Sequence, residues 1–311
     1  MKEAFVWCDC DLDGAVSYCL LCWYFGKKLP HKTTTVSNFD NEFTTWKAQG
    51  NLEKYEKVFI VDINPSKVVD AVDKDNIIII DHHTDHVDNK GIYKKATTVL
   101  ERCTSCAKLM YETLKKKLDI TESQKLLVLL ADDYDSYTLA VPQSYMLNVV
   151  LWSMQGDRVA KFYENFNSGF NGFDNFQKNI LLHNEKKLNR MKRELQVYKT
   201  FLVINGKEVR FVSCVADSCI NELAHYIIEK YKGDIGIIVN LKTQRLSIRR
   251  SKQCSIDLSA LINKIGTGGG HEYAAGGEIN EKFLTFSKLL IPANEQVSTV
   301  SKKSKPKDRD V

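Results

Sequence analysis

Three aspartates stand on alternate positions near the start of the chain, directly after a short apolar run. They are Asp9, Asp11 and Asp13, within the stretch VWCDCDLDGAVS. The residues AFVW before them are typical of a buried strand, and GAVSYCLLCWYFG after them is typical of an apolar helix that begins near Gly14. Alternate residues of an extended segment share a face, so the three carboxylates can converge. Since like charges repel, we expect a cation to make this crowding favourable.

Further acids follow apolar segments later in the chain. Asp62 ends the run VFIVD, and Asp81 ends NIIIID and is followed by two histidines. A helical run ends in three more acids, which are Asp132, Asp133 and Asp135. Carboxylates joined by one or two imidazoles suit Mn²⁺ or Mg²⁺ better than structural zinc. Two such ions about 3.5–4 Å apart, bridged by a carboxylate, are typical of sites that hydrolyse phosphate esters.

The elements that must position these acids alternate between strand and helix. Apolar runs predict strands over 58–62 and 76–83, and helical patterns cover 104–118 and 122–136. This rhythm predicts an α/β fold in which the N-terminal domain has a doubly wound, mostly parallel sheet. The 311 residues suggest two domains, the second a smaller α/β domain. The predicted segments are a catalytic domain over 1–173, a linker helix over 174–199, a substrate-binding domain over 200–292 and a disordered basic tail over 293–311.

The charge and the cysteine content limit the substrates and the location that we expect for this protein. The formal net charge is +5, but the last 11 residues alone carry +3, so the body of the chain is nearly neutral. A long single strand normally requires a basic groove, so this body favours short nucleic-acid substrates. No stretch approaches 18 uninterrupted apolar residues, which argues against a membrane span. Nine scattered cysteines favour reduced thiols and a cytoplasmic location.

The ordered motifs resemble those of the DHH phosphoesterases, in the subfamily with the DHH-associated C-terminal domain. DCDLDGAVS is similar to the first motif in the form found in RecJ-type single-strand exonucleases, and the chain also resembles the nanoRNases of this family. VDI (61–63), DHH (81–83) and LLADDYDS (129–136) resemble the second, third and fourth motifs. GTGGGHEYAAGG (266–277) resembles the signature of the second domain, and SIRRS (247–251) the arginine-bearing strand before it.

The resemblance implies a site for two Mn²⁺ ions, with Mg²⁺ as the alternative. The implied metal ligands are Asp9, Asp11, Asp13, Asp62, His82 and Asp132. Asp62 would bridge the two ions. Many family members carry a histidine where this chain has Trp7, and Asp9 either supplies the missing ligand or only orients a water. In the fourth motif Asp132 and Asp133 are adjacent, and we favour Asp132 as the ligand.

Catalytic roles are implied for His83, Asp81 and Asp9. His83 would face the scissile phosphate or support it, and Asp81 would orient the two histidines, since metal-bound imidazoles need an acceptor for their second nitrogen.

In the second domain, the glycines of GTGGG let the backbone approach an anion, and HEYAA is expected to begin a helix behind them. The residues expected to hold a phosphate or a terminal nucleotide are Arg249, Arg250, Gly268, Gly269, Gly270 and His271.

The resulting interpretation is a metal-dependent exonuclease that releases mononucleotides from an end of single-stranded nucleic acid. Long single-stranded DNA is favoured by the first motif, and short oligonucleotides are favoured by the modest length and neutral body. Two alternatives remain: a cyclic-dinucleotide or nucleotide phosphodiesterase with the same site, and a catalytically impaired nucleic-acid-binding protein, which Trp7 alone favours.

Overall fold

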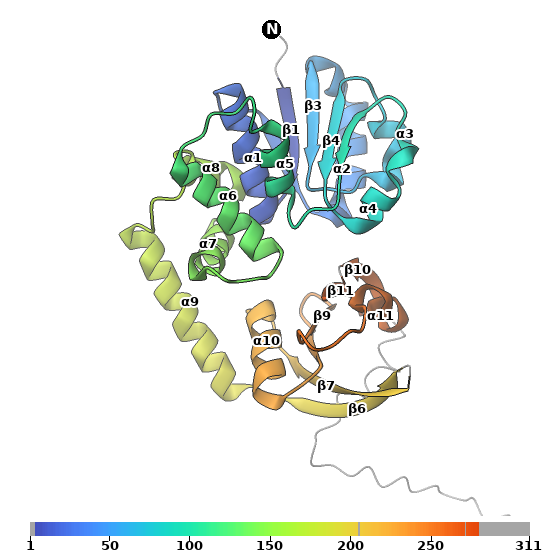
Figure 1. The fold of residues 1–311 in the computed structure, drawn as a ribbon, viewed down its shortest axis with the longest axis vertical. Coiled ribbons are helices and arrows are strands. Elements are labelled where there is room, and N and C mark those ends of the chain that lie inside the picture. Colours follow the sequence, from blue (N-terminus) through green and yellow to red (C-terminus); the bar gives the residue numbers. More distant parts are fainter. Residues whose placement is uncertain (1–3, 205, 271, 280–311) are drawn as a thin grey trace, which may run out of the picture. The chain divides into compact units, whose positions relative to one another are not determined.

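The computed structural model describes residues 4–204, 206–270 and 272–279. The chain divides into two compact units, residues 1–184 and 185–311, each containing strands and helices (Figure 1). The predicted α/β class is confirmed. The predicted tail over 293–311 and the last part of the predicted second domain lie outside the described residues.

The first unit contains a five-stranded sheet in the order β2-β1-β3-β4-β5, and all its pairings are parallel. Its strands are β1 (Ala4–Asp9), β2 (His31–Thr34), β3 (Lys57–Val61), β4 (Ile77–Asp81) and β5 (Thr97–Leu100). The chain leaves β1 for β2 on one side and then returns to pair β3 on the other side. The strand order therefore reverses between β1 and β3. Ligands of parallel sheets bind at the carboxyl ends of strands at such a switch point.

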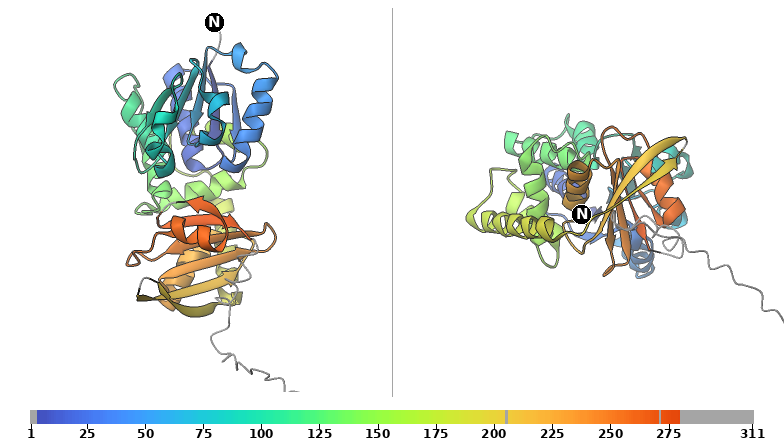
Figure 2. Two further views of the ribbon diagram at one scale, coloured as in Figure 1. Left: turned by 90° about the vertical axis from the view of Figure 1, so that its right-hand side faces the viewer. Right: turned by 90° about the horizontal axis from the view of Figure 1, so that it is seen from below.

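Helices cover both faces of this sheet (Figure 2). One apolar core is shared with α1 (Leu12–Phe25), α5 (Cys106–Leu114), α6 (Glu122–Asp135), α7 (Pro142–Ser153) and α8 (Arg158–Phe166). The other face carries α2 (Val36–Ala48), α3 (Val69–Val72) and α4 (Thr84–Asp88). Along β1, Val6 and Cys8 belong to the first core, and Phe5 and Trp7 belong to the second. This alternation is the two-residue period of a strand with both faces buried.

Trp7 is a core residue. Its side chain is fully buried, and its ring lies 5.5–5.7 Å, centre to centre, from the rings of Phe39, Phe43 and Trp46 on α2. Aromatic pairs at this distance and tilt are favourable beyond their buried area. The residue at this position therefore fills the core between the sheet and α2.

A long helix, α9 (Asn175–Glu194), occupies the charged stretch predicted to be helical. It is shorter than the predicted 174–199, because the strand β6 already begins at Tyr198. The division between the two units falls within this helix, after Asn184.

The second unit contains a six-stranded sheet in the order β10-β11-β9-β8-β7-β6, in which only β7 and β8 pair in parallel. Its strands are β6 (Tyr198–Ile204), β7 (Lys207–Val215), β8 (Ile235–Asn240), β9 (Arg245–Arg250), β10 (Thr267–Gly270) and β11 (Ala274–Glu278). The helix α10 (Ile220–Tyr231) packs on one face of the sheet, and α11 (Leu258–Ile265) packs on the other.

The prediction that a helix begins at HEYAA is wrong, because the last two residues of this stretch begin the strand β11. The glycines explain the difference. A Cβ atom on Gly268 would lie 2.1 Å from the carbonyl oxygen of Gly276, and one on Gly270 would lie 2.4 Å from that of Ala274. The glycines therefore permit two strands to pair closely, where the sequence had suggested a loop before a helix. Within the described part of the chain, no helix combines the length and apolarity needed to cross a membrane.

Candidate metal centre

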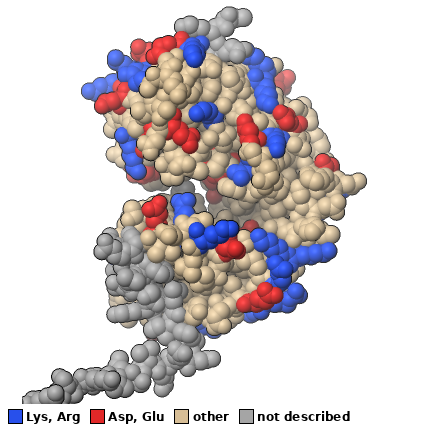
Figure 3. All heavy atoms as spheres, turned by 180° about the vertical axis from the view of Figure 1, so that it is seen from behind, with Lys and Arg blue, Asp and Glu red and all other residues tan. Residues whose placement is uncertain are grey.

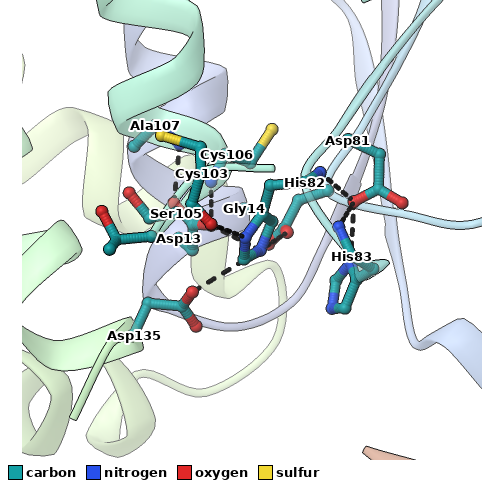
Figure 4. A network of polar contacts seen from close by, with 12 residues as sticks. Asp13, Gly14, Asp81, His82, His83, Cys103, Ser105, Cys106, Ala107 and Asp135 are labelled. Atoms are coloured by element: carbon teal, nitrogen blue, oxygen red, sulfur yellow. Dashed lines mark hydrogen bonds and ion pairs between the residues drawn. The ribbon is translucent and has the colours of Figure 1, made fainter. Parts of the chain in front are cut away.

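Three carboxylates from separate elements converge on one imidazole at the carboxyl edge of the parallel sheet. Figure 4 labels two of them, Asp13 and Asp135, beside His82. The Nε2 atom of His82 lies 3.6 Å from Asp13 Oδ2, 3.5 Å from Asp62 Oδ1 and 3.5 Å from Asp135 Oδ2. Two groups of donor atoms, each within 4.8 Å of one another, occur here: Asp62, Asp81, His82 and His83, and Asp13, His82 and Asp135. His82 belongs to both groups, so it lies at the centre of the arrangement.

Asp13 is held by the beginning of a helix. Its carboxylate accepts hydrogen bonds from the backbone N–H groups of Cys106 (2.6 Å) and Ala107 (2.8 Å), in the first turn of α5. These N–H groups have no partner within the helix, and the helix dipole places partial positive charge there. Ser105 caps the same helix by accepting from Lys108 N. The amino end of α5 therefore stabilises a buried carboxylate that faces three other ionisable groups.

Gly14 permits the close approach of α1 to the end of β1. A Cβ atom at this position would lie 2.4 Å from the carbonyl oxygen of Asp9. A side chain here would push apart the two elements that carry the first motif. The glycine is therefore a geometric requirement of the turn.

Asp62 follows β3 in the left-handed backbone region, with φ of 59°. Aspartate adopts this conformation more readily than most residues, and such backbone is concentrated at functional sites. Its N–H donates to the carbonyl of Ile80 on β4 (3.0 Å), so the turn is tied to the neighbouring strand. This turn places the buried carboxylate against His82.

The tautomer of His82 follows from its second contact. Nδ1 lies 3.2 Å from the carbonyl oxygen of Cys103, which can only accept, so Nδ1 carries the proton. If neither a proton nor a metal ion is bound at Nε2, this atom presents its lone pair to three carboxylates. Lone pairs facing lone pairs are unfavourable unless a proton or a metal ion lies between them. This donor set therefore fits a divalent cation bound by oxygen and one imidazole nitrogen.

Asp81 orients the histidines that follow it in the chain. Its Oδ1 accepts from His83 Nδ1 (2.7 Å) and from the backbone N–H of His82 (2.9 Å), and its Oδ2 accepts from His86 Nδ1 (2.6 Å). His86 is fully buried, and its Nε2 lies 2.8 Å from the hydroxyl of Tyr93. Both oxygens of Asp81 are thus occupied by donors. His86 and Tyr93 were not singled out from the sequence; the repeated histidine in DHHTDH was the available signal.

The acidic side chains are too crowded to be fully ionised without a cation. Burial, followed by the charge of Asp11, raises the pKa of Asp9 to about 7 and that of Asp13 to about 6. Burial, followed by the charge of Asp13, raises the pKa of Asp62 and of Asp135 well above the usual range. These shifts are the expected result of placing several carboxylates in one poorly solvated space.

Asp81 and His83 are shifted in the opposite sense. Burial disfavours both charges, but the contact with His83 holds the pKa of Asp81 far below its usual range. Asp81 in turn raises the pKa of His83 to about 10, against the effect of burial. The two side chains therefore form an ion pair beside the crowded carboxylates.

The fourth motif supplies Asp135 to this cluster and directs Asp132 and Asp133 elsewhere. Asp132 accepts from the hydroxyls of Thr104 and Ser105 and from Lys108 Nζ (3.2 Å), which ties α6 to α5. Asp133 accepts from the N–H groups of Ala140 and Val141 and from the hydroxyl of Ser144. Asp132, the ligand favoured from the sequence, therefore does not reach His82. Asp135 lies three residues later, on the same side of α6, and does.

Asp9 and Asp11 lie next to the cluster but outside both groups of donor atoms. Asp11 caps α1, because its Oδ1 accepts from Gly14 N (3.0 Å). Asp9 Oδ1 accepts from the N–H of the following residue (2.5 Å). Since α1 begins at Leu12, the first motif is not one extended segment with its three acids on one face. The charge of Asp11 still acts on the cluster, because it contributes to the raised pKa values of Asp13 and Asp62.

The predicted substrate-binding residues lie in the second unit. Arg249 and Arg250 are consecutive on β9 and point to opposite faces. Arg249 donates to Asn221 Oδ1 on α10 (2.5 Å), whereas Arg250 donates to the carbonyl of Ile256 (2.9 Å) and to Glu272 Oε1 (2.5 Å). Gly268, Gly269 and Gly270 form the edge strand β10, and all three are exposed. His271 lies outside the described residues.

Comparison with known proteins supports the expected family. Residues 3–132 match the model of the DHH family, N-terminal domain. Among solved structures, the chain is similar to the pGpG-specific phosphodiesterase PggH from Vibrio cholerae (TM-score 0.55, 13% identity, 92% of this chain and 96% of that one). It is also similar to the exonuclease RecJ bound to manganese (TM-score 0.51, 11% identity, 92% and 88%) and to an exopolyphosphatase-related protein from Bacteroides fragilis (TM-score 0.53, 14% identity, 93% and 91%). At these identities the likeness concerns the fold alone.

No curated protein matches the chain. The family match covers β1 to β5 and the helices between them, and it includes Asp13, Asp62, Asp81 and His82. Residues 3–132, somewhat less than half of the chain, are therefore similar to the N-terminal domain of the DHH family.

Proposed function

We propose that this protein is a metal-dependent phosphodiesterase that removes mononucleotides from an end of short single-stranded nucleic acid. The observation that carries the proposal is the convergence of Asp13, Asp62 and Asp135 on Nε2 of His82. The DHH family match supports the class of metal-dependent phosphoesterases. Two Mn²⁺ ions are the proposed cofactors, with Mg²⁺ as the alternative.

The residues proposed to hold metal are Asp13, Asp62, His82 and Asp135. When bound, such ions activate the attacking water and neutralise charge that develops on phosphorus. Asp62 is the proposed bridge, because its carboxylate is buried beside His82 at the switch point of the sheet. Asp9 and Asp11 are proposed to complete the shell or to orient water, because the charge of Asp11 acts on Asp13 and Asp62 and Asp9 interacts in turn with Asp11 and His83.

The protein's own groups prepare the site for a phosphate. Asp81 fixes the orientation of the His83 ring through Nδ1, at the edge of the acidic cluster. The charge of Asp81 favours the protonated form of His83, as the raised pKa indicates. His83 is partly exposed, with 30% of its side chain accessible, so a substrate can reach it. We therefore propose His83 as the residue that positions the scissile phosphate.

The choice of short substrates is supported by charge. The formal net charge is +5, of which the last 11 residues carry +3, and on the face drawn in Figure 3 acidic side chains stand among the basic ones. The similar proteins include one named for pGpG and one named as an exonuclease, and these names agree with a short strand read from an end. In the second unit we propose Arg249 and the glycines of β10 as phosphate contacts, with Arg250 in a supporting role because Glu272 pairs with it. All nine cysteines are free thiols, which supports a cytoplasmic location.

The test is hydrolysis of end-labelled DNA and RNA of graded length by the purified protein with Mn²⁺. We expect mononucleotide products, highest rates for the shortest strands and complete loss of activity with a chelator. Full activity in excess chelator would refute the metal-dependent reading. Release of internal fragments before mononucleotides would refute attack from an end.

A further inference from the structure

Trp152 is a large aromatic side chain that the fold leaves at the surface. It lies near the end of α7 and is 49% exposed, whereas Trp7 and Trp46 are buried. The guanidinium of Arg158, at the beginning of α8, lies over its ring, 4.1 Å from Cζ to the ring centre. A single exposed aromatic residue is common in proteins and indicates nothing by itself. A functional role for Trp152 therefore depends on which residues lie next to it.

Arg158 connects this ring to the first motif. Its Nη1 lies 3.5 Å from the carbonyl oxygen of Cys10, in the turn between Asp9 and Asp11. That turn joins β1 to α1 at the switch point of the sheet. Arg158 therefore lies between the ring of Trp152 and the backbone of the loop that borders the candidate metal centre.

The guanidinium has unused capacity for hydrogen bonding. Its Nε is buried and has no hydrogen-bond partner among the described residues. The neighbouring carboxylate of Asp157 is directed to His31 (3.2 Å) and to the N–H of Ala160 (2.9 Å). A buried donor without a partner is unfavourable, so a shift of the side chain that brings the guanidinium to a bound acceptor removes this cost. An arginine beside a phosphodiester site, with a donor to spare, suits a phosphate oxygen.

We propose that Trp152 and Arg158 form a nucleotide-binding platform beside the candidate metal centre, on which a nucleobase stacks against the indole while a phosphate accepts from the guanidinium. The proposal rests on the proposed function and narrows its substrate class to phosphodiesters that carry a base. Stacking of a base on an aromatic side chain contributes about 1–3 kcal/mol and tolerates any base. The positive charge of Arg158 also offsets repulsion between an incoming phosphate and the acidic cluster.

The experiment compares binding of two short single-stranded oligonucleotides of equal length, one with bases and one with abasic tetrahydrofuran sugars. Affinity is measured on the full chain in chelator, which prevents hydrolysis, by anisotropy of a label on the oligonucleotide. The wild type is expected to prefer the base-containing strand by at least about fivefold, the low end of one stacked base. Trp152→Leu is expected to bring this preference close to one, with little change in affinity for the abasic strand.

Two further variants separate the contributions. Arg158→Lys retains the charge but loses the planar guanidinium, so it is expected to weaken binding of both strands. Phe176→Leu is the matched control, because Phe176 is a 73% exposed aromatic residue on α9, and it should leave both affinities unchanged. Intrinsic fluorescence gives a second readout: quenching by the base-containing strand should disappear in Trp152→Leu.

The outcomes distinguish the platform from the proposed function. Equal affinity of the wild type for both strands, or an unchanged preference in Trp152→Leu, would overturn the platform. Rapid hydrolysis of base-containing strands with Mn²⁺ would leave the proposed function standing in either case. A base preference that depends on Trp152, without any hydrolysis, would support the platform and refute the proposed function.

Discussion

Asp135→Asn and Asp132→Asn should affect the melting temperature of the metal-free protein differently, although the two residues are only three positions apart. Asp135 faces His82 Nε2 at 3.5 Å and has a pKa raised by burial and by the charge of Asp13. Its neutralisation removes repulsion in the metal-free protein, so the melting temperature without metal should stay equal or rise. Asp132 instead pairs with Lys108 and with two hydroxyls, and its neutralisation removes favourable contacts.

The magnitudes follow from these contacts. The pair of Asp132 and Lys108 is partly exposed, at 22% and 44%, and is worth about 0–1 kcal/mol. Weakened acceptance from Ser105 adds about 1 kcal/mol, so Asp132→Asn should lower the melting temperature by about 2–8 °C. Mn²⁺ at 100 times the wild-type dissociation constant stabilises by about 2.7 kcal/mol, or about 5–11 °C. A hundredfold weaker affinity in Asp135→Asn would reduce this gain to about 0.4 kcal/mol.

The assay is thermal unfolding of the wild type and both variants, in chelator and in Mn²⁺, with calorimetric titration of Mn²⁺ at constant temperature. Asp132→Asn should keep the wild-type gain from Mn²⁺ on a lower baseline, and Asp135→Asn should lose most of the gain. The reasoning fails if Asp135→Asn binds Mn²⁺ as tightly as the wild type. It also fails if Asp132→Asn is the variant that loses Mn²⁺.

Three other changes probe the same region. In the metal-free protein, Asp9 and Asp13 have pKa values raised to about 7 and about 6, so the folded state binds protons more tightly than the unfolded chain. The free energy of unfolding should therefore fall as pH rises from about 4 to about 7, which urea unfolding in chelator at several pH values measures; a rise over this range would contradict the assignment. Gly14→Ala should displace the carbonyl of Asp9, 2.4 Å from the new Cβ, and weaken Mn²⁺ binding in a calorimetric titration, whereas unchanged affinity would show that the turn can adjust. Tyr93→Phe removes the hydroxyl that contacts His86 and should lower kcat more than Mn²⁺ affinity, because Asp81 and His83 would be less rigidly held; equal losses in both would indicate a structural role alone.

Much of the fold was accessible from the sequence because it depends on local pattern. The β-branched run before Asp81 could hardly form anything but a buried parallel strand, and β4 is that strand. The glycines after Ile265 were misread because their role depends on the partner strand. Only the distance from Gly268 to the backbone of Gly276 reveals that a hairpin requires them.

Less of the candidate site could be predicted from the sequence, because residue spacing does not reveal which donors form hydrogen bonds with a given carboxylate. Asp132 and Asp135 lie on the same side of α6, and periodicity cannot distinguish them. The difference arises from α5, a separate helix, whose Thr104, Ser105 and Lys108 reach Asp132 first. The role of His86 could not be predicted for a similar reason, since its contact with Asp81 depends on the short helix after the third motif.

The acids of this edge divide into two kinds according to how their lone pairs are used. Asp81, Asp132 and Asp133 have donors on both oxygens, so their charges are satisfied by the protein. Asp62 and Asp135 face His82 instead. Their pKa values are raised, because burial and the neighbouring carboxylates disfavour the charged form of each.

Asp13 combines both kinds, since α5 donates to its two oxygens while Oδ2 also faces His82. A carboxylate held in this way keeps its position whether or not a cation is bound. The amino end of α5 thus organises the site in advance, which reduces the reorganisation that metal binding requires. Asp13→Asn would keep one acceptor for the helix but remove the charge. We therefore expect it to lower Mn²⁺ affinity far more than stability, by the same calorimetric and thermal measurements, and a predominant loss of stability would show that α5 depends on the charge itself.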